Sequence, residues 1–256
     1  MYKLIWLKEL KGELYTWKST AWLLAASLLF SFTSYLLLTN KELTLLDQTE
    51  LLWLLGKVIV GVGLLVVTID ASSIVSSEFE QETAESLFLT PLALKDFLLG
   101  KLLASLTLWI LIYIISVPYI IVASAGSRLA LPFMEQVFLL GTLCILGFIL
   151  MTFAIALLYR SSKNTLTTAF VILLAAAVPA LFAATLKSGS VLTTVSKINP
   201  LDNVFSALDN VLVDYQISLG QNWQFYLPLI IFGLVMLGLL LAAAQRFRKQ
   251  GIIRNE

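Results

Sequence analysis

The 256-residue sequence contains no histidine and a single cysteine, Cys144. Without histidine there is no His-ligated metal site, no Ser-His or Cys-His nucleophile and no imidazole proton relay. One cysteine cannot form an internal disulfide, and its place in an apolar run predicts a buried small hydrophobe. These absences argue against most classes of enzyme, and we expect no catalytic residue and no bound metal.

Charged residues are also scarce. They make up 13% of the chain, about half the ordinary share, while hydrophobic residues make up 59%. The mean hydropathy is +0.92. A soluble domain of this length could not bury so much apolar surface, so the sequence predicts an integral membrane protein. The formal net charge of +1, with no basic stripe, predicts no nucleic-acid partner.

Six apolar runs are each long enough to cross a hydrocarbon core of about 30 Å as a helix. The runs are continuous rather than alternating, which favours helices over a β-barrel. We therefore predict an all-α membrane protein in which residues 1–256 form a single transmembrane domain. The predicted spans are 19–39, 52–75, 98–123, 137–159, 165–186 and 225–244.

Lysine and arginine are distributed unequally between the two sides of these spans. Most lie on the side that holds both termini, and this bias predicts cytoplasmic termini. The loops 76–97 and 160–164 then face the cytoplasm, and the longest non-spanning segment, 187–224, faces outward.

The N-terminal segment 1–18 has a helical pattern. Trp6, Leu10, Leu14 and Trp17 recur on one face, and Lys8, Glu9 and Lys11 lie away from it. This pattern predicts an amphipathic helix at the membrane surface, in contact with lipid. The alternative is an unstructured leader whose lysines only set the topology.

The loop between the second and third spans is acidic. Ser77 and Glu80 have the spacing of a capping box, and Pro91 ends a helix before it, which predicts a short helix over 78–89. Glu78, Glu82, Glu85 and Leu89 form one stripe of this helix. An acidic and apolar helix suits docking in a cleft of a soluble protein. The alternative is a solvated acidic loop without a partner.

The run Glu80-x-Glu82-Thr83-x-Glu85-x-Leu87-x-x-x-Pro91, followed by Gly100-Lys101, resembles the cytoplasmic signature of ABC-2-type transporter permeases. The chain departs from that signature at Glu82, where glycine is usual, and at Ala84, where leucine is usual. The resemblance extends to the whole topology of the chain, including the N-terminal segment and the long outer segment.

This resemblance implies that 78–89 is a coupling helix seated in a separate ATP-binding subunit. The implied docking residues are Glu78, Phe79, Glu80, Glu82, Thr83, Glu85, Leu87 and Leu89. The chain has no Walker A motif, so we expect it to bind no cofactor, with ATP and Mg²⁺ on the partner. The resemblance also implies a homodimeric exporter subunit in a bacterial plasma (inner) membrane. The apolar spans favour a hydrophobic or amphipathic cargo, such as a drug, a lipid-like molecule or a modified peptide.

The outer segment 187–224 contains a second amphipathic pattern. Asn199-Pro200 reads as an N-cap followed by proline at the first helical position. The residues that follow form an apolar stripe, which predicts a helix of about sixteen residues. The members of the stripe are Leu201, Val204, Leu208, Val211 and Tyr215. This helix either lies on the outer leaflet or, as the resemblance implies, belongs to a re-entrant pair that caps the pathway.

Within the spans, charged and small residues stand out. We expect Asp70 to pair with Lys101 near the inner mouth or to face a pathway, and Lys57 to reach toward the outer interface. Ala176, Ala180 and Ala184 recur every four residues and predict a close helix-packing face, within the protomer or across a dimer.

Two other classes of function remain open. A secondary transporter or sodium-extruding system would use Asp70 and Lys57 without an ATPase. A membrane transferase would use Asp202, Asp209 and Asp214, although these aspartates lack the close pairing that a metal–diphosphate site needs.

Overall fold

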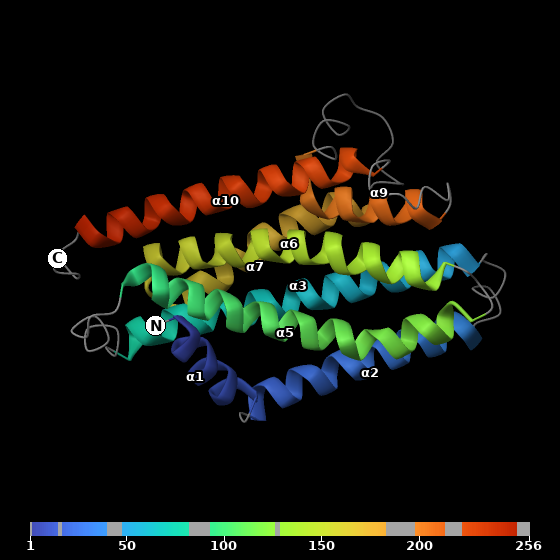
Figure 1. Ribbon diagram of the computed structural model, residues 1–256, viewed down its shortest axis with the longest axis horizontal. Helices are drawn as coiled ribbons and strands as arrows, with labels where there is room; N and C mark the ends of the chain where they lie inside the picture. The colour runs from blue at the N-terminus through green and yellow to red at the C-terminus, as the bar shows by residue number, and fades with distance from the viewer. Residues whose placement is uncertain are drawn as a thin grey trace.

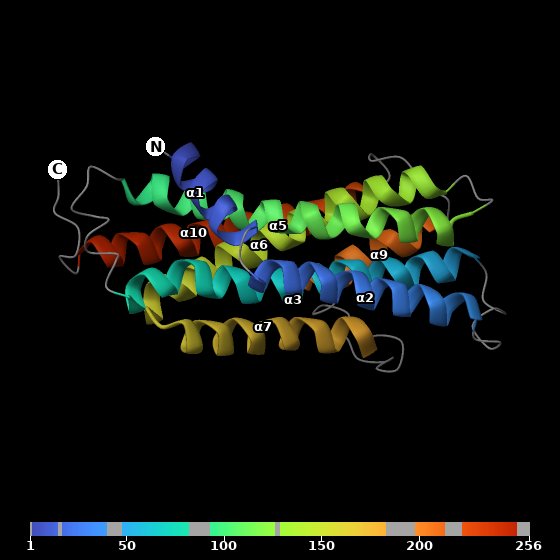
Figure 2. The same ribbon diagram turned by 90° about the horizontal axis from the view of Figure 1, so that it is seen from below.

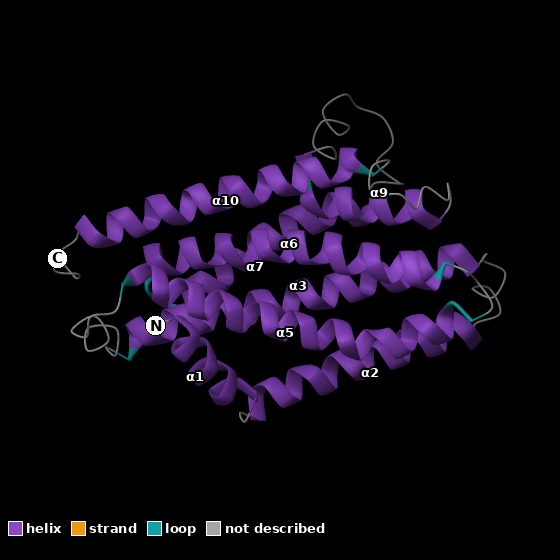
Figure 3. Ribbon diagram, viewed as in Figure 1, coloured by secondary structure: helices purple, strands orange, loops and turns teal. Residues whose placement is uncertain are grey.

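The structure, a computed structural model, describes residues 2–14, 17–39, 48–81, 93–125, 129–182, 198–212 and 222–249. Within these ranges all regular structure is helical (Figure 1, Figure 3). The helices are α1 Tyr2–Leu14, α2 Trp17–Thr39, α3 Gln48–Glu80, α5 Leu94–Ala123, α6 Ala130–Tyr159, α7 Ser162–Phe182, α9 Pro200–Leu212 and α10 Trp223–Lys249.

Six of the described helices are long and apolar enough to cross a membrane, in agreement with the six predicted runs. These are α2, α3, α5, α6, α7 and α10, and they lie side by side along one long axis (Figure 1, Figure 2). The chain is therefore a multi-pass helical membrane protein. Its 33-residue helix α3 is about 50 Å long, so its ends extend beyond a hydrocarbon core of about 30 Å.

Helices α6 and α3 form the centre of the bundle. Burial differs among the helices over the most apolar 18-residue stretch of each. In that stretch 72% of the residues of α6 and 56% of those of α3 are buried, but only 17% of those of α10. Helices α2, α7 and α10 instead expose large apolar side chains such as Phe32, Val171 and Leu234. Apolar side chains on the outer helices are what lipid tails solvate, so the burial pattern agrees with a membrane environment.

The three helices α3, α5 and α6 meet around Trp109 of α5, which is fully buried. Its ring lies against Gly63 of α3 and Gly141 of α6. If these residues carried a Cβ, that atom would come within 2.7 Å of a ring carbon at Gly63 and within 2.8 Å of one at Gly141. The indole Nε1 donates a hydrogen bond to Thr142 Oγ1 at 2.9 Å. Two glycines therefore make the space that lets a tryptophan pack between three spans.

Helix α1 packs across α5 instead of continuing into α2 (Figure 2). Trp6 Nε1 donates to Thr107 Oγ1 at 3.2 Å. Because α1 ends at Leu14 and α2 begins at Trp17, the predicted apolar stripe is divided between two helices. Glu9, which lies off the predicted apolar stripe, forms an ion pair with Lys101 of α5. That α1 lies at the membrane surface stays a prediction.

Helix α9 begins as the sequence predicted. Leu201 N donates to Asn199 Oδ1 at 3.1 Å, which is the expected N-cap. Its apolar face is buried against α3, α6, α7 and α10, so α9 lies within the bundle (Figure 2). The helix has 13 residues rather than about sixteen, and Tyr215 lies outside the described residues.

The two ends of the bundle differ in what they hold. The C-terminal ends of α3, α6 and α10 and the N-terminal ends of α5 and α7 lie at one end, which we call the termini end (Figure 1). The opposite end holds α9 and the start of α3, where Gln48 Nε2 donates to the carbonyl oxygens of Ala123 and Ala125. The start of α1 and the end of α10 both lie toward the termini end, as an even number of spans requires (Figure 1).

Candidate functional site

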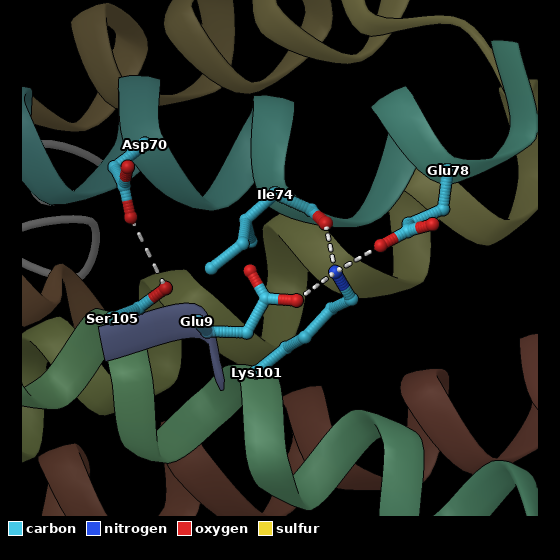
Figure 4. A network of polar contacts seen from close by, with 6 residues as sticks. All are labelled: Glu9, Asp70, Ile74, Glu78, Lys101 and Ser105. Atoms are coloured by element: carbon cyan, nitrogen blue, oxygen red, sulfur yellow. Dashed lines mark hydrogen bonds and ion pairs between the residues drawn. The ribbon is translucent and has the colours of Figure 1, made fainter. Parts of the chain in front are cut away.

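Toward the termini end, one face of α3 meets one face of α5. On α3, Asp70, Ile74 and Glu78 recur every four residues, so they share a face; on α5, Lys101 and Ser105 do the same. Figure 4 shows these two faces opposed, with Glu9 from α1 approaching the same point. Three helices thus contribute polar groups to one cluster inside an otherwise apolar bundle.

Lys101 is the centre of this cluster, and only 1% of its side chain is exposed. Its Nζ lies 3.1 Å from Glu9 Oε1 and 3.2 Å from Glu78 Oε1, and it donates to the carbonyl oxygen of Ile74 at 2.6 Å. An ammonium has three donors, and these three acceptors use them all. Lys101 therefore joins α1, α3 and α5 through two ion pairs and one hydrogen bond.

Asp70 lies one turn before Ile74 in the same cluster. The two ion pairs described for Lys101 are those with Glu9 and Glu78, and pairing of Asp70 with Lys101 stays a prediction. Asp70 is 7% exposed, and the Ser105 hydroxyl lies 3.5 Å from its Oδ2. The expectation missed Glu9, because no local pattern links it to a lysine 92 residues away.

A cavity of about 270 Å³ lies beside this cluster. Its lining includes all four charged groups, Glu9, Asp70, Glu78 and Lys101, together with Ser19 and Trp22. Three carboxylates therefore share one cavity with one ammonium, so the position of that ammonium controls the local electrostatics.

The last turn of α3 contains the first three residues of the predicted coupling helix. Glu78, Phe79 and Glu80 continue α3, and Gln81 N donates to Ser77 O at 3.0 Å. The predicted helix start at Glu78 is therefore wrong, because the preceding span extends through the capping-box residues. The remaining predicted docking residues lie outside the described residues; they are Glu82, Thr83, Glu85, Leu87 and Leu89.

Glu80 joins this last turn to α7. Its carboxylate accepts hydrogen bonds from Ser162 N at 2.7 Å and Ser162 Oγ at 2.9 Å. A carboxylate at the first turn of a helix also interacts favourably with the helix dipole. The contacts at Glu80 and Lys101 together connect the end of α3 to α1, α5 and α7.

Aromatic packing extends the same junction to α10. The rings of Phe79 and Phe247 have centroids 5.3 Å apart, and the Arg160 guanidinium lies 5.1 Å from the Phe247 centroid. Arg160 forms the turn between α6 and α7, with a positive φ of 53°. The end of α3 thus contacts the end of α10, and the α6–α7 turn contacts the same ring of α10.

Lys57 belongs to a separate contact at the opposite end of the bundle. Its ammonium lies 3.3 Å from the Trp53 ring centroid and 5.3 Å from that of Phe205 on α9. Asp209 and Asp202, also on α9, attract its charge. Lys57 therefore helps to hold α9 against α3, and it lies about 20 Å along α3 from Asp70.

The alanine stripe of α7 packs partly within the protomer. Ala180 is 4% exposed, and the carbonyl oxygen of Ala176 accepts a hydrogen bond from Asn199 Nδ2 at 2.7 Å. Ala184 lies outside the described residues. The Asn199 side chain thus caps α9 and also fixes it to α7.

The charged groups of this cluster form ion pairs and hydrogen bonds that hold α1, α3 and α5 together. Among the described residues, no group of three or more His, Cys, Asp or Glu side chains is arranged to hold a metal ion.

The sequence matches no model of a known protein family, and a search of curated proteins finds no match to it either.

Proposed function

We propose that this chain is the membrane permease subunit of an ATP-driven ABC exporter. Two copies would form the translocation path and would bind two separate ATP-binding subunits, which would carry ATP and Mg²⁺. The proposal places the chain in a bacterial plasma membrane, with both termini cytoplasmic. Docking would involve the acidic segment that begins at Glu78 and continues through Glu82 and Glu85.

The observation that carries the proposal is how the end of α3 is held. Glu78 contacts Lys101, which also contacts α1, and Glu80 contacts the start of α7. A displacement of the acidic segment that follows would therefore be transmitted to α1, α5 and α7 together. Coupling requires a rigid element with different contacts in two states, and a braced helix end provides such an element.

The cargo would be hydrophobic or amphipathic. The described spans carry few ionisable groups, and the polar cavity beside Lys101 is small and lies at one end of the bundle. A strongly hydrated ion would find few polar groups along the rest of such a path.

Co-purification with an ABC ATP-binding subunit from the same genome tests the proposal. We expect the two proteins to elute together in detergent and the double variant Glu82→Lys/Glu85→Lys to lose the ATPase. The matched control is Glu50→Lys/Glu135→Lys, which makes the same change of charge with exposed residues at the opposite end of the bundle. Loss of binding in both double variants, or in neither, would contradict docking through the acidic segment.

A second candidate function is secondary transport or sodium extrusion through Asp70. The observation that favours it is a buried carboxylate within a span and beside a cavity. It predicts gradient-driven flux by the purified chain alone in liposomes, abolished in Asp70→Asn. The exporter proposal predicts no such flux without the ATPase.

A further inference from the structure

Helix α1 has two different faces. On its inner face, Trp6 and Glu9 bind side chains of α5. The opposite face, which we call the outer face of α1, consists of exposed lysines and leucines: Lys3, Leu4, Leu7, Lys8 and Lys11. With 3.6 residues per turn, these five positions fall within an arc of about 140° on the side of the helix opposite Glu9. Helix α1 therefore carries a surface that the rest of the bundle leaves exposed.

Leucines and lysines are arranged regularly on the outer face. Leu4 and Leu7 lie near the middle of the arc and are 72% and 46% exposed, while Lys3 and Lys8 lie at its two edges. A helix at a membrane surface inserts leucines toward the acyl chains, and its lysines reach outward to the phosphates. We propose that the outer face of α1 is a docking surface for the headgroups of anionic phospholipids.

The connection to α2 brings α1 close to the lipid. Helix α1 ends at Leu14 and the apolar span of α2 begins at Ser19, and a chain of five residues reaches at most about 18 Å. Figure 1 shows α1 running obliquely from the start of α2 toward the termini end. Trp17, at the start of α2, is 82% exposed and is of the residue type that favours the boundary between lipid and water.

The charge of the outer face selects the kind of lipid. The face carries three positive charges and no negative one, and among the described residues none of the three lysines forms an ion pair. A lysine close to an anionic membrane surface contributes about a fivefold preference for that surface. An acidic soluble protein would also attract the lysines, but the exposed leucines between them favour a lipid surface. Headgroups would then hold α1 from its outer face while Lys101 holds it from its inner face.

Lipid contact can be measured at the outer face itself. In the purified full chain with Cys144→Ala, an apolar fluorophore on Leu4→Cys would be quenched in nanodiscs by spin-labelled lipid. The spin label would be carried either by phosphatidylglycerol, which is anionic, or by phosphatidylcholine, which is zwitterionic, at the same mole fraction. We expect quenching by the anionic lipid to be about fivefold stronger. The triple variant Lys3→Gln/Lys8→Gln/Lys11→Gln should bring this ratio to about one, and the corresponding triple Lys→Arg variant should keep it.

The matched control is Lys95→Gln/Lys163→Gln/Arg246→Gln, which removes three exposed charges from other helices at the same end of the bundle and should leave the ratio unchanged. Equal quenching by the two lipids in the unmodified face, or an equal fall in both triple Gln variants, would overturn the proposal. Quenching by a water-soluble quencher but by neither lipid would also overturn it and would assign this face to a soluble partner. No ATPase is present in the measurement, so failure of the exporter proposal would leave its result unaffected.

Discussion

Glu80 accepts two hydrogen bonds from Ser162, one from the backbone N–H at 2.7 Å and one from the hydroxyl at 2.9 Å. These residues are 82 positions apart in the sequence, at the end of α3 and the start of α7. This contact holds the end of α3 against the start of α7 at the termini end of the bundle. The acidic segment of the sequence follows directly after Glu80.

Removal of the Glu80 carboxylate should loosen the start of α7. We expect Glu80→Ala to speed amide hydrogen exchange at Ser162 and in the first turn of α7, because the N–H loses its acceptor. Glu80→Gln keeps an acceptor oxygen and should have a smaller effect. Equal exchange in wild type and Glu80→Ala would show that the contact does not hold the two helices.

The space beside Trp109 should not tolerate a larger residue. We expect Gly63→Ala to destabilise the chain by about 1–3 kcal/mol, because the new Cβ would overlap the indole ring. The measurement is the unfolding temperature in detergent. Gly61→Ala is the matched control, because nothing lies within 4 Å of a Cβ there, and it should be neutral or slightly stabilising.

A double variant shows whether the ring is the cause. Trp109→Phe makes the ring smaller, so we expect its combination with Gly63→Ala to cost less than the sum of the two single changes. Strictly additive costs would mean that Gly63 is needed for a reason other than its contact with Trp109.

Asn199 should stabilise α9 through two separable contacts. We expect Asn199→Ala to cost about 0.5–2 kcal/mol from the lost N-cap alone. Asn199→Ser keeps a capping oxygen but removes the amide donor to Ala176, so it should cost less. Unfolding temperatures of the two variants, measured side by side, test this order; an equal loss would mean that the cap contributes nothing.

The sequence was sufficient to predict the helices that depend on local composition. Long apolar runs identified the six spans, since burial in lipid needs only length and hydropathy. Asn199 and Pro200 identified the start of α9, because an N-cap is formed by adjacent residues. These predictions did not require knowledge of which helices contact one another.

The contacts of the candidate site depend on tertiary packing, which a local pattern does not contain. Ser77 and Glu80 have the spacing of a capping box, but α3 continues through them and Glu80 instead binds Ser162 of α7. Glu9 has no apparent role on α1 until α5 brings Lys101 to it. Lys101 was recognised as a partner for an acid, but the choice among three carboxylates is decided by how α1, α3 and α5 cross.

The most direct test of the exporter proposal is the ATP hydrolysis rate of an ABC ATP-binding subunit from the same genome, measured in nanodiscs with this chain. We predict that the chain changes that rate and that Glu82→Lys/Glu85→Lys removes the change, while Glu50→Lys/Glu135→Lys preserves it. An ATPase rate that is the same with and without the chain, together with solute flux by the chain alone, would contradict the account and favour transport through Asp70.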